Sequence, residues 1–186
     1  MTKRLVCFGD SLTAYDYDDD GSERLIPRLQ KGLPGWDVIN AGSGGNNTYA
    51  ALERINADVI SHSPDFVAVF FGANDAADYK LVPLGEFEAN ILKITEMISP
   101  SKTLLITPAP VNENIPLGRT NAVMKIYGDA VKRVAAKTGC HVVDLFAVMI
   151  ASSGFEKLFS DGIHFSEKGY VLLAPLILDY MKANIL

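Results

Sequence analysis

The sequence has only two cysteines, too few for a disulfide framework in a chain of 186 residues. Cys7 lies inside an apolar run and Cys140 begins another. Both are therefore predicted to be small, buried core residues of a protein from a reducing compartment. Hydrophobic residues make up 48% of the chain, enough for a single domain over residues 1–186 to close its core without crosslinks.

The sequence also lacks long apolar runs and basic runs. No segment reaches the roughly 18 to 20 apolar residues that a membrane-spanning helix needs. The 17 Lys and Arg against 22 Asp and Glu give a net charge of −5, so the counterion release that drives nucleic-acid binding has no basic cluster to act through. We therefore expect no membrane span and no nucleic-acid partner.

A secretory leader is not evident either. Residues 1–4 are basic, but the apolar stretch that follows covers only residues 5–8, which is too short for the core of a signal peptide. The sequence predicts a cytoplasmic protein, although a secreted protein whose leader had been removed would read the same way.

Short apolar, β-branched runs alternate with longer segments of helical period, which predicts an α/β fold with a parallel sheet and crossover helices. We expect strands at residues 4–8, 37–40, 66–71, 103–107 and 141–144, and helices near residues 23–32, 49–61, 84–98, 120–138 and 166–184. Ser166 is a plausible N-cap and Gly139 a helix stop, whereas Pro27 and Pro175 should weaken the first and last helices.

The chain has only three histidines, which limits the residues that could act as a catalytic base. A serine hydroxyl is a poor nucleophile until an imidazole removes its proton, so Ser11 in the segment Phe-Gly-Asp-Ser-Leu-Thr needs a histidine. Of the three in the chain, only His164 has a carboxylate, Asp161, placed three residues upstream to orient its ring. Ser11, His164 and Asp161 together predict acyl transfer through a serine intermediate.

Acyl transfer also requires donors for the negative charge on the carbonyl oxygen. The glycine-rich residues 40–48 can present backbone N–H groups without side-chain obstruction, and Asn74 offers a side-chain amide. The segments that carry Ser11, the glycines and Asn74 each follow a predicted strand, where open α/β sheets bind their ligands. Of the acidic neighbours, Asp10 is expected to brace its turn and Asp75 to anchor its loop.

At this point the sequence resembles the SGNH hydrolases, also called GDSL esterases and lipases. Gly-Asp-Ser-Leu at residues 9–12, Gly-Ala-Asn-Asp at 72–75 and Asp-Gly-Ile-His at 161–164 match the family's blocks in order and spacing, over nearly the whole chain. The resemblance implies a three-layer α/β/α, flavodoxin-like fold with a five-stranded parallel sheet. The α/β-hydrolase fold is disfavoured independently, because Ser11 lacks the Gly-x-Ser-x-Gly pattern.

The resemblance further implies Ser11 as nucleophile, His164 as base and Asp161 as its orienter. It implies the Ser11 backbone N–H, a glycine of the family's second block, here the glycine-rich residues 40–48, and the Asn74 amide as oxyanion donors. Gly45 is the first choice for that glycine and Gly44 the alternative, because the extra glycine can shift the loop by one position.

Two further segments border the predicted site. Asp16, Asp18, Asp20 and Gly21 coincide with positions of a calcium loop, but its twelfth position is Pro27 instead of glutamate. A solvated acidic loop that disfavours anionic substrates is the better interpretation, with no metal site. Residues 111–118 are expected to form a wall of the acyl or alcohol pocket, or else a plain surface connection.

The sequence thus predicts a serine esterase that cleaves small carboxylic esters, with short acyl groups such as acetate preferred because the loops are short. It predicts no metal or organic cofactor. The alternatives are an acetylated carbohydrate or a lysophospholipid as substrate, or a non-catalytic binding module whose residues 42–45 cradle a phosphorylated ligand.

Overall fold

Five parallel strands form one sheet in the computed structural model, which describes residues 2–186. The order across the sheet is β2-β1-β3-β4-β5. The strands are β1 (Lys3–Gly9), β2 (Trp36–Gly42), β3 (Phe66–Phe70), β4 (Thr103–Ile106) and β5 (His141–Val143). All five predicted strands are confirmed to within a few residues, and β3, the central strand, is buried along its whole length.

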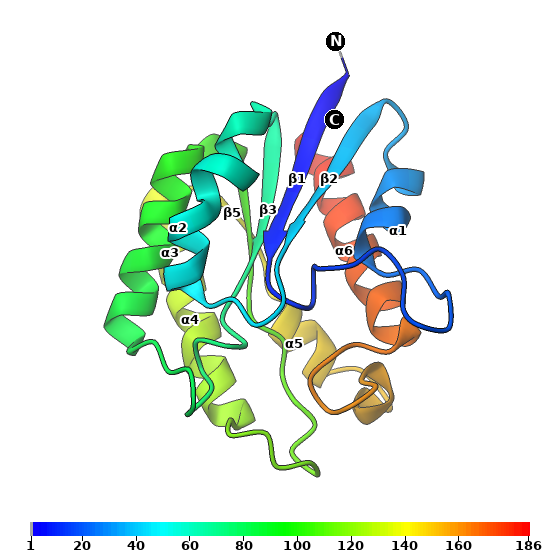
Figure 1. Ribbon diagram of the computed structural model, residues 1–186, viewed down its shortest axis with the longest axis vertical. Coiled ribbons are helices and arrows are strands. Elements are labelled where there is room, and N and C mark those ends of the chain that lie inside the picture. Colours follow the sequence, from blue (N-terminus) through cyan, green and yellow to red (C-terminus); the bar gives the residue numbers. More distant parts are fainter. Residues whose placement is uncertain (1) are drawn as a thin grey trace.

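Helices cover both faces of the sheet, as Figure 1 shows: α2, α3 and α4 lie on one face, and α1 and α6 on the other. The helices are α1 (Leu25–Gly32), α2 (Thr48–Asp58), α3 (Leu84–Ile98), α4 (Asn121–Thr138), α5 (Leu145–Ile150) and α6 (Glu167–Asn184). Contacts between α1 and α6, and from α3 to α2 and α4, join neighbours within each layer. The predicted three-layer α/β/α fold with a five-stranded parallel sheet is confirmed.

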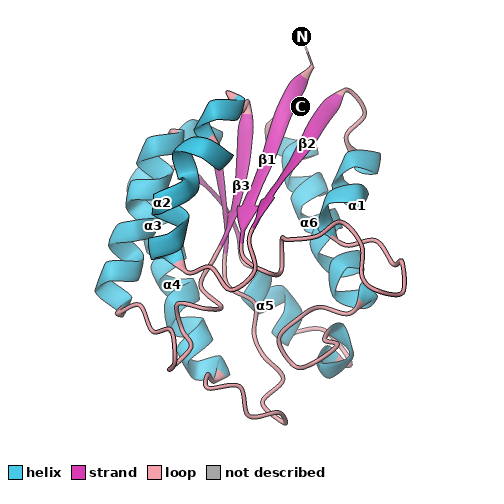
Figure 2. Cartoon of the chain, viewed as in Figure 1, coloured by secondary structure: helices cyan, strands magenta, loops and turns pink. Residues whose placement is uncertain are grey.

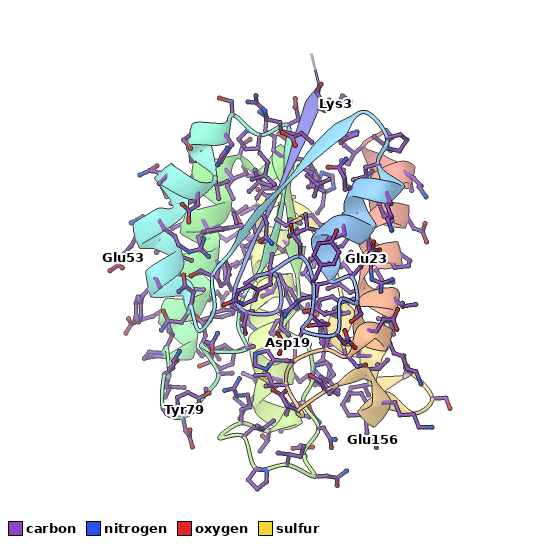
Figure 3. All side chains as sticks on the ribbon, turned by 45° about the vertical axis from the view of Figure 1, so that its right-hand side comes forward. Lys3, Asp19, Glu23, Glu53, Tyr79 and Glu156 are labelled. Carbon is purple, nitrogen blue, oxygen red and sulfur yellow. The ribbon has the colours of Figure 1, made fainter. Side chains whose placement is uncertain are left out.

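The register brings the ends of the three adjoining strands level with one another. Gly9 pairs with Gly42 of β2 and with Phe70 of β3. The loops after β1, β2 and β3 therefore leave the sheet side by side, and Figure 2 shows loops gathered at this end. In Figure 3, Lys3 at the start of β1 lies at the opposite end from Asp19 and Tyr79, which belong to these loops.

The helix boundaries correct several expectations. Helix α1 begins at Leu25, so Pro27 falls in its first turn, where a missing N–H costs no helix bond. Pro175 lies inside α6, yet the helix continues to Asn184. Helix α5 was not predicted, because six residues are too few to show a helical period; the Asp144 side chain caps it by accepting from the Ala147 N–H.

Of the two predicted helix-end residues, Gly139 is confirmed, whereas Ser166 is confirmed in its position only. Gly139 ends α4 in the left-handed region, with φ of 72°, as predicted. Ser166 occupies the N-cap position of α6, but its hydroxyl donates to the carbonyl of Lys157 and makes no bond to the helix. The position was right and the capping bond was wrong: the hydroxyl is directed at the Lys157 carbonyl and accepts from no N–H of the first turn.

The core runs through the sheet and the inner faces of both helix layers. Cys7 and Cys140 are free and buried in it, as predicted. Leu158 and Phe165, which flank the Asp161 to His164 turn, are core residues as well. Across residues 2–186, no helix combines the length and apolar character that crossing a bilayer requires.

Candidate active site

Ser11 lies in the tight turn that directly follows β1. The N–H groups of Thr13 and Ala14 both donate to the carbonyl of Asp10, and the Asp10 carboxylate accepts from the Leu12 N–H at 2.9 Å. Asp10 thus braces the turn, as expected from its position. The guanidinium of Arg24 donates to the carbonyl of Ser11 at 2.5 Å and holds the outer side of the same turn.

His164 and Asp161 lie in the turn that precedes α6. One oxygen of Asp161 accepts from the backbone N–H groups of Ile163 at 3.1 Å and His164 at 2.8 Å, and the other lies 2.6 Å from His164 Nδ1. Ser160 N–H donates to the carbonyl of His164 and closes the turn. The carboxylate therefore fixes both the turn and the ring that it carries.

The two turns meet across the end of the sheet. His164 Nε2 lies 3.0 Å from Ser11 Oγ, although 153 positions separate the two residues. With Nδ1–H directed at Asp161, Nε2 is free to accept the serine proton. Partial burial of Asp161 tends to raise its pKa, but the hydrogen bonds from the His164 ring and from the backbone of the turn outweigh it and lower the pKa below its usual range.

The glycine-rich loop after β2, residues 43–47, lies beside the Ser11 turn. It is called the oxyanion loop below because the sequence predicts that one of its backbone N–H groups is an oxyanion donor. Ser43 N–H donates to the carbonyl of Gly9 at 3.0 Å, and Lys80 Nζ donates to the carbonyl of Gly45 at 2.7 Å. Gly45 has a φ of 73°, in the left-handed region that favours glycine. Within residues 2–186, the backbone N–H groups of Ser11, Gly44 and Gly45 donate to no protein acceptor.

Asn74 lies in the loop after β3 and is 7% exposed. Its Nδ2 donates to the carbonyl of Asn46 at 2.9 Å and, at 3.3 Å, to Asp10. The next residue, Asp75, accepts from both the N–H and the hydroxyl of Thr48, at 2.8 and 2.6 Å, and so anchors this loop to the start of α2. Direct hydrogen bonds thus join the segments 9–12, 40–48 and 72–75 to one another.

The carboxyl groups of Asp10 and Asp75 are buried, and burial raises the pKa of both. Removal from water raises the pKa of Asp10 to about 6, even though the Leu12 N–H favours its charged form. Burial also raises the pKa of Asp75 against the hydrogen bonds from Thr48. Asp161, which is more exposed and has two backbone donors, is shifted in the opposite direction.

Three arginines that the motifs did not indicate bind backbone carbonyls around the site. Arg24 binds the carbonyl of Ser11, Arg54 that of Gly9 and Arg119 that of Ala73. The arginine and its carbonyl are 13 positions apart for Arg24, 45 for Arg54 and 46 for Arg119. The sequence offers no local pattern that marks such contacts, since any arginine on these segments could equally face solvent.

The acidic loop after the Ser11 turn directs its carboxylates to protein donors. Asp16 accepts from the Asn40 amide at 2.9 Å, Asp18 pairs with Arg24 at 3.3 Å, and Asp20 accepts from Ser22. Within residues 2–186, no group of three or more metal-binding side chains is placed to hold an ion. These contacts give the loop an ordered structure of its own.

A largely apolar cavity of about 650 Å³ lies between the loops that follow β3 and β4. Gly162 of the Asp161 to His164 turn lies directly against Ile115 and Leu117, which line this cavity, so its wall is continuous with the turn that carries His164. The lining side chains include Ala76, Leu81, Ile115, Pro116, Leu117 and Val123. The segment 111–118 therefore lines an apolar cavity that adjoins this turn.

Comparison with known proteins gives matches over most of the chain. Residues 7–172 match the family described as GDSL-like Lipase/Acylhydrolase. The human isoamyl acetate-hydrolyzing esterase 1 homolog is 33% identical, and the match covers 89% of this chain and 76% of the human protein. The isoamyl acetate-hydrolyzing esterase of Saccharomyces cerevisiae is 29% identical, with coverage of 97% and 86%.

Solved structures show the same architecture. The crystal structure of a lipase/acylhydrolase from Enterococcus faecalis has a TM-score of 0.91 and 33% identity, and the match covers 97% of this chain and 96% of that one. An acetyl xylan esterase from Geobacillus stearothermophilus has a TM-score of 0.76 and 26% identity, with coverage of 99% and 96%.

Proposed function

The chain belongs to the GDSL-like lipase/acylhydrolase family and is a carboxylic ester hydrolase; from this premise we propose that Ser11 is its nucleophile, His164 its general base and Asp161 the carboxylate that orients the base. The observation that carries the proposal is the continuous line of contacts from Ser11 Oγ to His164 Nε2 at 3.0 Å and from His164 Nδ1 to Asp161 at 2.6 Å. Family membership replaces the alternative of a non-catalytic binding module.

The proposed reaction has two halves. Ser11 Oγ attacks the ester carbonyl carbon while His164 Nε2 takes the hydroxyl proton, and the imidazolium then protonates the departing alcohol oxygen as the carbon–oxygen bond breaks. Water next attacks the acyl-enzyme and gives a proton to His164, which returns it to Ser11 Oγ as the carboxylic acid leaves. Asp161 stabilises the imidazolium throughout and does not itself take the proton.

The proposed oxyanion hole consists of the Ser11 N–H, the Gly45 N–H and the Asn74 amide. Both backbone groups lie at the end of the sheet without a protein acceptor, as described above, and Asn74 Nδ2 lies in the same hydrogen-bonded cluster. Gly44 is the alternative to Gly45. Such donors act because they are already oriented toward the oxygen on which charge develops.

We propose that the substrates are small esters with short acyl groups, acetate above all. The isoamyl acetate-hydrolyzing and acetyl xylan esterases among the similar proteins support this. Ile115 and Leu117 of the apolar cavity are proposed to contact the acyl or alcohol part. The carboxylates of Asp16, Asp18 and Asp20 disfavour an anionic substrate near Ser11.

A fluorophosphonate probe tests the nucleophile. We expect the wild-type protein to be labelled at Ser11 and the Ser11→Ala variant to remain unlabelled and inactive, because the probe phosphonylates an activated serine hydroxyl. Ser160→Ala, which removes an exposed serine hydroxyl near His164, is the matched control and should label normally. Equal labelling of Ser11→Ala and wild type would remove Ser11 from the mechanism.

Chain-length dependence tests the acyl preference. Across p-nitrophenyl esters of increasing acyl length, kcat/KM should be highest for the acetate or butyrate and fall for longer chains. The leaving group is the same throughout the series, so the comparison reports acyl recognition alone. A maximum at long acyl chains would contradict the proposal.

Acetylated carbohydrate is a second candidate, favoured by the similarity to the acetyl xylan esterase. It predicts a higher kcat/KM for acetylated xylooligosaccharides than for isoamyl acetate at equal ester concentration. We also propose a cytoplasmic location, for which the two free, buried cysteines are the support.

A further inference from the structure

Arg54 lies in the middle of α2, and its guanidinium contacts two of the catalytic loops at once. Nη2 donates to the carbonyl of Gly9 at 2.8 Å, at the end of β1 two residues before Ser11. Nη1 donates to the carbonyl of Ala41 at 2.8 Å, near the end of β2, and Nε donates to the side-chain oxygen of Asn46 at 2.7 Å. One planar group thus spans the ends of two strands and the loop between β2 and α2.

Packing holds this guanidinium in one place. Its central carbon lies 4.5 Å from the centre of the Phe8 ring, and its side chain is 17% exposed. Glu53, the preceding residue of α2, points away from the sheet in Figure 3. A stacked, mostly buried guanidinium with several acceptors has little freedom to reorient.

The contacts of Arg54 continue to the proposed oxyanion donors. Asn46, whose side chain accepts from Arg54, follows Gly45 directly, and its carbonyl accepts from Asn74 Nδ2 at 2.9 Å. Displacing Asn46 would therefore move both the Gly45 N–H and the acceptor that aligns the Asn74 amide. On the other side, the carbonyl of Gly9 accepts from both Arg54 and Ser43 N–H, so the oxyanion loop and the Ser11 turn share an anchor.

From this geometry we infer that Arg54 is a positioning residue, which sets the distance between the oxyanion loop and the Ser11 turn and thereby stabilises the transition state without touching substrate. The inference rests on the proposed function. This positioning role requires a guanidinium and not only a positive charge. The acceptors on Gly9, Ala41 and Asn46 lie in different directions, and a rigid fork of N–H donors can bind all three. Lysine, with a single ammonium, cannot meet all three at these distances.

The experiment compares Arg54→Lys with wild type on p-nitrophenyl acetate. We expect kcat to fall by roughly 10- to 100-fold, because a misplaced oxyanion donor loses the contact made mainly in the transition state, while KM stays within about threefold. Asn46→Ala removes the Nε acceptor and leaves both carbonyl contacts in place. It should lower kcat by a smaller factor, and the double variant should be no worse than Arg54→Lys alone.

Two control variants separate positioning from stability and charge. Ile55→Val loosens the buried face of α2 one residue away and should lower the Tm while leaving kcat near the wild-type value. Asp58→Asn removes the charge that pairs with Arg54 at 2.9 Å from the solvent side, where the Asp58 side chain is 41% exposed, and should also leave kcat nearly unchanged. Circular dichroism and Tm are measured on every variant, and Asn46→Ala carries the test if Arg54→Lys does not fold.

The outcomes are distinct. A kcat for Arg54→Lys within about threefold of wild type, or a loss that appears in KM alone, would overturn the inference. A kcat loss in Ile55→Val equal to that in Arg54→Lys would reduce Arg54 to a stability role and overturn it too. Failure of the proposed function would appear differently, as turnover that survives Ser11→Ala whatever the Arg54 variant does.

Discussion

At the scale of single residues, Asn74 directs both of its amide hydrogens to protein acceptors. The bond to Asn46 at 2.9 Å is of ordinary length, whereas the 3.3 Å contact with Asp10 is long for an N–H···O bond. We expect the N–H of the longer contact to be shared with a developing oxyanion while the shorter bond keeps the amide in place. This division would let one side chain serve both as a structural tie and as a donor.

Asn74→Ala should therefore lower kcat by about 10²- to 10³-fold and raise KM much less, because the lost donor acts chiefly in the transition state. Steady-state kinetics on p-nitrophenyl acetate measures both constants. Asn90→Ala, which removes a part-buried amide that donates to Thr48, is the control and should change kcat only slightly. A large rise in KM with unchanged kcat would assign Asn74 to substrate binding instead.

At the scale of elements, the ends of α3 and α4 offer a matched pair of glycines. Gly139 ends α4 with φ of 72°, whereas Gly85 lies in the first turn of α3 with ordinary helical backbone. A methyl group added at either position would meet no atom within 4 Å. Substitution by alanine at these sites thus changes the backbone preference and little else.

Gly139→Ala should lower the free energy of unfolding by about 1 kcal/mol, since a Cβ disfavours the left-handed conformation. Gly85→Ala should raise it by about 0.5 kcal/mol, because alanine loses less conformational freedom in a helix. Urea denaturation of the two variants beside wild type gives both values. Effects of the same sign would contradict the interpretation, and Gly139→Asn should fall between Gly139→Ala and wild type because asparagine tolerates this conformation.

At the scale of the whole molecule, the buried Asp10 couples the stability of the fold to pH. In the unfolded chain its carboxyl ionises near the ordinary pKa of 3.8, whereas burial raises the pKa to about 6 in the folded state. Between these values the folded protein binds the proton and the unfolded chain does not. The ionisation of Asp10 therefore lowers the free energy of unfolding as the pH rises from about 4 to 6, and the Asp10 carboxyl favours the folded state least at neutral pH.

The Asp10→Asn variant removes this titration. Relative to the variant, wild type should lose about 2 kcal/mol of unfolding free energy between pH 4 and pH 6.5, because about 1.4 kcal/mol accompanies each pH unit over which one proton separates the two states, and the separation is incomplete at both ends of this range. The other carboxylates largely cancel in the comparison, and any fixed cost of the amide beside Asn74 shifts the difference equally at each pH. Urea denaturation across this range measures it, and a difference independent of pH would exclude the burial effect.

The sequence by itself determined the arrangement of elements and the chemically active residue types. The alternation of buried β-branched runs with helical segments depends on local burial patterns, so all five strands and the long helices could be predicted, while the six-residue α5 could not. Asp161 and His164 are three residues apart in one turn, so the hydrogen bonds between them follow from the local geometry of that turn. Ser11, by contrast, could be linked to them only indirectly, because a serine nucleophile needs a base, His164 alone has a carboxylate three residues upstream, and a known family shares this motif order.

Only the tertiary structure decided how these pieces meet. Parallel pairing with level strand ends brings Ser11 within 3.0 Å of His164, and it places Arg54 of α2 against the carbonyls of Gly9 and Ala41. Such contacts join atoms that are distant in the chain, and they depend on how helices pack on the sheet instead of on any local preference. The sequence therefore carries the groups proposed to react, and the packing of the whole molecule sets the distances on which their proposed chemistry depends.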